Sequence, residues 1–79
     1  MNNKQEYNKV FIESFSISES ALNNDLKYNS IPEWDSIGHM GLVAELEEVF
    51  DIMMEMDDII DFSSYKKGFE LIEKYGVEF

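Results

Sequence analysis

Residues 34–51 read WDSIGHMGLVAELEEVFD, and this stretch carries the clearest structural signal in the 79-residue chain. Apolar side chains recur in it at three- and four-residue spacing, the period of an amphipathic helix. The pattern predicts a helix over about residues 36 to 51. One face of this helix is expected in the core, and it consists of Leu42, Val43, Leu46, Val49, Phe50 and Met53.

The opposite face of this helix has an unusual composition for a solvent-exposed surface. It begins with a hydroxyl, continues with apolar side chains and ends in acids. Such a face favours a docking surface. Its residues are Ser36, Ile37, Met40, Ala44, Glu47, Glu48 and Asp51. Of the two glycines in the helix, Gly38 is expected near the core edge, where it lets the preceding loop approach closely, and Gly41 has no evident role.

The segment before this helix predicts a first helix and a long loop. The first helix is expected to start near Asn3, with a capping box between Asn3 and Glu6. Its apolar stripe is Tyr7, Val10, Phe11 and Phe15. The connection from Ser16 to Asp35 is expected to be an ordered loop with one short helical turn, because a compact domain rarely holds a structureless loop this long. Its apolar anchors are Ile17, Leu22, Leu26, Tyr28, Ile31 and Trp34.

The segment after the main helix predicts two more helical pieces. A short one covers about residues 56 to 60, and Phe62 follows it as a core residue. A last helix is expected from an N-cap at Ser64 to Tyr75, with Gly76 in a left-handed conformation behind it. Its stripe is Tyr65, Phe69, Ile72 and Tyr75. No alternating strand pattern occurs, so the predicted fold class is all-α: a small bundle of three main helices plus one short helix, with a long ordered loop between the first and second helices.

Charge is distributed unevenly along the chain. The formal net charge is −11, from 17 acids and 6 lysines. Ten of the acids and none of the lysines lie between residues 33 and 61. Nucleic acid and anionic membranes are therefore disfavoured as partners, because both would be repelled, and a basic protein surface is favoured.

Length and composition limit the other possibilities. The length of the chain predicts one domain, residues 1–79, with one small core and no deep cavity. It has no cysteine, which excludes disulfides and thiolate metal sites. No dedicated metal site is expected, because the acids lack the spacing of a calcium-binding loop. With no apolar run long enough to span a bilayer and no signal-peptide pattern, a cytoplasmic monomer is expected.

The dipeptide Asp35-Ser36 is the candidate for chemistry. A group attached to Ser36 would project from a helix N-terminus, where unpaired amides and the helix dipole favour a phosphodiester. Asp35 beside it could hold a divalent cation of the kind that phosphoryl transfer requires.

With Glu47, Glu48 and Phe50 following in the same helix, Asp35-Ser36-Ile37 resembles the acyl carrier protein family. The resemblance covers almost the whole chain, including its length, its acidity and the long first loop. Two positions depart from the family pattern: Glu33 replaces the usual glycine two residues before the Asp, with Trp34 between them, and Ile37 replaces the usual leucine after the Ser. The form Trp34-Asp35-Ser36-Ile37-Gly38-His39 looks more like the free-standing carriers of specialised pathways (aminoacyl, D-alanyl or sugar-decorating systems) than the fatty-acid carrier.

The resemblance implies a function for each of these residues. Ser36 would carry a 4′-phosphopantetheine arm that a magnesium-dependent phosphopantetheinyl transferase moves from coenzyme A. The thiol of the arm would hold an acyl or aminoacyl group as a thioester, so the protein would act as a carrier and not as an enzyme. Asp35 would aid loading and metal positioning. Basic patches of loading ligases, acyltransferases and synthases would dock on Ile37, Met40, Ala44, Glu47 and Glu48.

Several features leave alternatives open. His39 is expected to be a partly buried imidazole bonded to the long loop, rather than the base of a Ser36 hydrolase. The methionines Met53, Met54 and Met56 are expected as adaptable core filler, or as a yielding wall for a bound chain. An unmodified acidic interaction module that binds a basic protein is the alternative function, and the cargo is not determined by the sequence.

Overall fold

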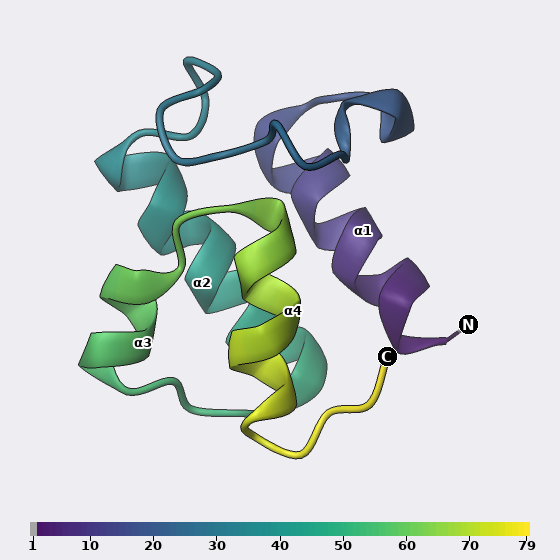
Figure 1. Cartoon of the computed structure of the whole chain (residues 1–79), viewed down its shortest axis with the longest axis vertical. Helices are drawn as coiled ribbons and strands as arrows, with labels where there is room; N and C mark the ends of the chain where they lie inside the picture. The colour runs from purple at the N-terminus through teal and green to yellow at the C-terminus, as the bar shows by residue number, and fades with distance from the viewer. Residues whose placement is uncertain (1) are drawn as a thin grey trace.

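Four α-helices follow one another in the computed structural model, which describes residues 2–79 (Figure 1). The described residues form no strand, only an isolated bridge between Lys27 and Ser64. The predicted all-α fold, with three longer helices, one short helix and a loop after the first, is confirmed. The helices are α1 (Asn3–Phe15), α2 (Ser36–Phe50), α3 (Met56–Asp61) and α4 (Tyr65–Glu73).

The start of α1 differs by one residue from the prediction. Asn2, not Asn3, is the N-cap: its side chain accepts a hydrogen bond of 2.8 Å from the Gln5 amide, and the Gln5 side chain accepts one of 3.2 Å in return. The sequence offers Asn at both positions, and a tertiary contact distinguishes them. The Asn3 side chain donates to the Glu78 carbonyl at 2.8 Å and so holds the C-terminal segment beside α1.

The core is dominated by aromatic side chains from three parts of the chain. The predicted stripe of α1 is buried, with Tyr7, Phe11 and Phe15 at most 1% exposed. Trp34 from the loop and Phe62 after α3 are equally buried. The Trp34 ring centroid lies 5.5 Å from that of Phe11 and 5.3 Å from that of Phe15. Loop, α1 and the α3–α4 connection therefore share one core, with α2 packed against it through Leu42, Val43 and Leu46.

The long loop is ordered by its own buried residues and by backbone bonds. Its predicted short turn is a 3-10 helix, Glu19–Ala21. Leu26 and Trp34 are buried, as predicted. Tyr28 is 39% exposed, so the prediction that it anchors the loop in the core is wrong. The reason is that the backbone at this point pairs with the segment before α4, where the Tyr28 amide donates to the Ser63 carbonyl at 2.9 Å. This pairing leaves the Tyr28 ring at the surface, where it becomes part of the site described below.

Two residues that were predicted in the core near the end of α2, Val49 and Met53, are exposed. The helix ends at Phe50, and Asp51 takes a left-handed conformation with φ of 53°. The helical period stops there, so Met53 is 85% exposed and Met54 takes the buried position instead. Val49 is 38% exposed at the edge of the stripe.

Helix α4 begins as predicted and ends two residues early. Ser64 is the N-cap and accepts a hydrogen bond of 2.9 Å from the Lys67 amide. After Glu73 the amides of Lys74, Tyr75 and Gly76 bond to carbonyls three residues back, which is a tighter turn than an α-helix. Gly76 has the predicted left-handed conformation, with φ of 93°.

Candidate functional site

Ser36 is the first residue of α2 and is exposed at the surface. The helix is capped by Asp35, whose Oδ1 accepts a hydrogen bond of 2.8 Å from the Gly38 amide. Within residues 2–79 the amides of Ser36 and Ile37 donate to no protein acceptor. The site therefore offers an accessible hydroxyl and unpaired backbone donors at a helix N-terminus, which suits a phosphate group.

Gly38 allows the loop to reach this helix end. A Cβ atom on Gly38 would overlap the carbonyl oxygen of Glu33. The expectation that the loop approaches α2 closely at this glycine is confirmed. Because the approach places the loop directly against the first turn, it fixes where Asp35 caps the helix.

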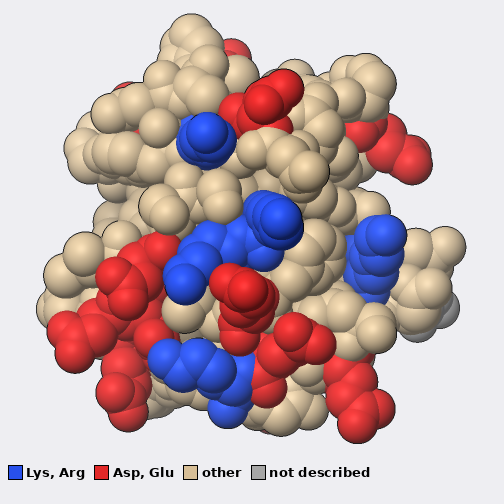
Figure 2. All heavy atoms as spheres, viewed as in Figure 1, with Lys and Arg blue, Asp and Glu red and all other residues tan. Residues whose placement is uncertain are grey.

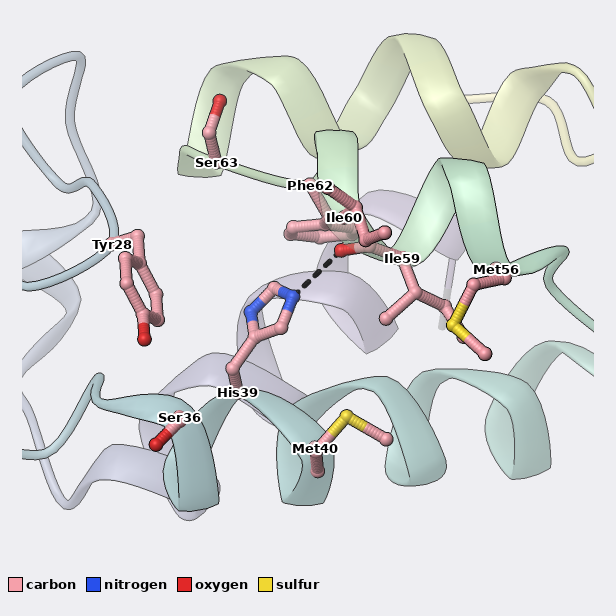
Figure 3. A pocket seen from close by; sticks show the side chains of 9 residues that line it. All are labelled: Tyr28, Ser36, His39, Met40, Met56, Ile59, Ile60, Phe62 and Ser63. Atoms are coloured by element: carbon pink, nitrogen blue, oxygen red, sulfur yellow. Dashed lines mark hydrogen bonds between the residues drawn. The ribbon is translucent and has the colours of Figure 1, made fainter.

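A cleft of about 360 Å³ opens between α2 and α3, with Ser36 at one end. Figure 3 shows α2 along one side and α3 along the other, with Tyr28 at the same end as Ser36. The wall is mainly apolar, and no Asp, Glu or Lys belongs to it. The lining residues are Tyr28, Ser36, His39, Met40, Met56, Ile59, Ile60, Phe62 and Ser63.

His39 crosses the cleft and connects both of its sides. Its Nδ1 accepts a hydrogen bond of 3.0 Å from the Trp34 indole, and its Nε2 lies 2.8 Å from the Ile59 carbonyl oxygen (Figure 3). This confirms a half-buried imidazole bonded to the long loop. Because both ring nitrogens are occupied, neither is available to accept the proton of the Ser36 hydroxyl.

The predicted recognition residues divide into two groups. Ile37 is 83% exposed and Met40 is 56% exposed, and Ala44 and Glu48 also face solvent. Glu47 is half-buried instead, and its Oε2 accepts a hydrogen bond of 2.8 Å from the Met54 amide. Glu47 therefore stabilises the turn after α2 in addition to contributing negative charge.

The cleft includes residues that the sequence did not identify as site residues, namely Tyr28, Ile59, Ile60 and Ser63. Met56 lies at the end of the cleft opposite Ser36, and only Met54 of the three methionines is core filler. A signal for the α3 wall was present in the sequence. Two adjacent isoleucines in a six-residue helix cannot both point into the core, and Ile60 is 70% exposed.

The short helix α3 is held to the end of α4 by one buried carboxylate. Asp58 accepts hydrogen bonds from the Lys74 ammonium at 2.6 Å and from the Tyr75 hydroxyl at 2.5 Å. The Lys74 hydrogen bond, followed by that from Tyr75, lowers the pKa of Asp58. The same bonds to Asp58 raise the pKa of Lys74 and of Tyr75.

Acidic side chains dominate one part of the surface. In Figure 2 they gather over α3, whereas lysines and acidic side chains lie among one another over α4 in the middle of the same face. Asp57 and Asp61 are exposed on α3, and Lys66 and Lys67 are exposed on α4, where Lys67 pairs with Glu70.

Comparison of the chain with protein-family models, with curated proteins and with solved structures finds no match. Among residues 2–79, no cluster of three or more His, Asp or Glu side chains is arranged to hold a metal ion. None of the described helices has the length and apolar character needed to cross a membrane.

Proposed function

We propose that this protein is an acyl-carrier-protein-like carrier that bears 4′-phosphopantetheine on Ser36. The observation that supports this best is the position of the Ser36 hydroxyl. It is exposed at the first residue of a capped helix, and an apolar cleft begins beside it. A modifying enzyme could reach such a hydroxyl, and the cleft could receive an apolar chain.

The residues around Ser36 suit the attached group. The phosphopantetheine arm would supply a thiol on a long tether, which no side chain of this cysteine-free protein provides. The unpaired amides of Ser36 and Ile37 would face its phosphodiester, and the dipole of α2 would favour that negative charge. Asp35 uses Oδ1 for the cap, so Oδ2 would be the oxygen that assists a divalent cation during loading.

Exposed side chains of α2 and α3, the two helices that form the sides of the cleft, would serve for recognition by partner enzymes. Ile37 and Met40 offer apolar contact, while Glu48, Asp57 and Asp61 offer negative charge. Basic patches on the transferase, the loading ligase and the synthase or acyltransferase would complement this surface. Such charge-steered contacts form quickly and are weakened by salt, as a carrier that visits several enzymes requires.

An intact-mass experiment tests the proposal. The protein is incubated with coenzyme A, Mg²⁺ and a broad-specificity phosphopantetheinyl transferase, and the mass is measured for wild type, Ser36→Ala and Ser63→Ala. Ser63 is the matched control, because it is an exposed serine that lines the same cleft. We expect wild type and Ser63→Ala to gain the mass of one phosphopantetheine group, and Ser36→Ala to gain nothing.

Two results would contradict the carrier function. One is the absence of modification with several transferases on the folded protein. The other is a gain of mass that survives Ser36→Ala. The first would favour the alternative, an unmodified acidic module that binds a basic protein through α2 and α3, and the second would place the attachment on a residue other than Ser36.

A further inference from the structure

The apolar wall of the cleft contains two methionines, one from each of its sides. Met40 lies one turn after Ser36 on the same face of α2, and Met56 is the first residue of α3. Both side chains line the cleft of about 360 Å³ (Figure 3). The lining side chains that contain no nitrogen or oxygen atom are those of Met40, Met56, Ile59, Ile60 and Phe62. Methionine therefore supplies two of these five apolar side chains.

The methionines differ in their access to solvent. Met40 is 56% exposed and Met56 is 71% exposed, whereas Met54 in the core is 5% exposed. Met53 is 85% exposed but does not line the cleft. Within residues 2–79 the chain thus has one buried methionine, one exposed methionine outside the cleft and two exposed methionines in its wall.

Oxidation would change an exposed methionine from an apolar to a polar side chain. Hydrogen peroxide transfers one oxygen atom to the thioether sulfur: the O–O bond breaks, an S=O bond forms, the sulfur is oxidised, and the second peroxide oxygen leaves as water with both hydrogens. The product, methionine sulfoxide, is polar and is returned to methionine by sulfoxide reductases. Because the chain has no cysteine, methionine is the side chain of this protein that is most open to reversible oxidation.

We propose that Met40 and Met56 are a pair of oxidation sites, and that peroxide converts the cleft between α2 and α3 from an apolar into a polar one. In its reduced form the cleft takes an uncharged apolar molecule or chain, since its wall holds no Asp, Glu or Lys side chain. Such an occupant cannot donate a hydrogen bond to an S=O group, so binding would strip the sulfoxide oxygen of its water without replacement. The inference concerns the unmodified protein and does not depend on the proposed function.

Binding of Nile red, a neutral apolar dye, tests the state of the cleft. The dye is titrated with reduced and with peroxide-treated protein, for wild type and for the double variant Met40→Leu/Met56→Leu. Leucine keeps the wall apolar at similar volume and has no sulfur to oxidise. We expect peroxide to weaken dye binding to wild type by about five- to tenfold, the effect of one polar group left without a hydrogen-bond partner. Binding to the double variant should not change, and methionine sulfoxide reductases should restore binding to wild type.

Met53→Leu is the matched control, because Met53 is exposed but lies outside the cleft lining. Peroxide should weaken dye binding to this variant as much as to wild type. Met1 is present in every variant, so its oxidation contributes equally to all of them. Fragmentation mass spectrometry of wild type should find sulfoxide at Met40 and Met56 well before it appears at Met54.

Three results would overturn the proposal. The first is that Nile red does not bind reduced wild type, since the cleft would then not take an apolar molecule. The second is an equal loss of dye binding in wild type and in the double variant, because another residue would then be responsible. The third is oxidation of Met54 as fast as that of Met40, because peroxide would then act on an unfolded form that has no cleft.

Discussion

The Tyr7 hydroxyl donates a hydrogen bond of 2.7 Å to the backbone carbonyl oxygen of Tyr65, 58 residues later in the chain. This bond joins α1 to the first turn of α4 inside the core. Tyr7 is fully buried, and burial raises its pKa well above the ordinary value of 10.0. The two helices approach closely at this point because the next residue of α4 to face Tyr7 is a glycine, Gly68, which is itself buried.

Gly68→Ala should destabilise the protein. A Cβ atom there would overlap the Tyr7 hydroxyl and the Phe62 ring, and both side chains are fixed by the core. Overpacking of this kind costs about 1–3 kcal/mol, which exceeds the gain in helix propensity. Urea unfolding followed by circular dichroism would measure the loss in the free energy of unfolding. An unchanged midpoint would show that α1 and α4 are less tightly packed than described.

Gly41→Ala should have the opposite effect and is the matched control. Gly41 lies in α2, and a Cβ atom there would meet no atom within 4 Å. The substitution should therefore raise the free energy of unfolding by about 1 kcal/mol through helix propensity alone. The same urea titration measures it. A loss of stability would mean that the glycine has a structural role that its open surroundings do not reveal.

Acid should weaken the contact between α3 and α4. The pKa of Asp58 is lowered by its bonds from Lys74 and Tyr75, so the folded state binds the proton less readily than the unfolded state. Its stabilising effect is complete above the ordinary value of 3.8 and is lost as the pH falls through the lower, folded value. Thermal melts across this range should show a steeper fall in Tm for wild type than for Asp58→Asn.

At neutral pH, Asp58→Asn should melt below wild type, because the charged partner Lys74 loses its carboxylate. Asp57→Asn is the control, since Asp57 is the exposed neighbour in the same helix. The Asp57→Asn substitution should leave the fall of Tm at low pH the same as in wild type. If Tm falls equally at low pH for wild type and Asp58→Asn, other carboxylates dominate acid unfolding.

The residues that sequence reasoning located correctly are those governed by local rules. The predicted start of α2 at residue 36 is confirmed, with Asp35 as its N-cap in the structure, and its buried stripe of Leu42, Val43 and Leu46 follows from helical period. The same local rules were wrong beyond Phe50. There the left-handed residue Asp51 ended the period and turned Met53 outward, a change that the apolar spacing does not encode.

The sequence by itself determined the acidic character, which is a matter of composition alone. It also determined the helical class and the placement of Ser36 at an exposed helix start, because both depend on residues within about one turn of each other. Only the tertiary structure decided that α3 lies beside α2, with Ile59 bonded to His39 twenty residues earlier and a cleft between them. The physical reason is that such distant contacts depend on how the shared aromatic core packs. Spacing along the chain carries no information about which carbonyl will meet which ring.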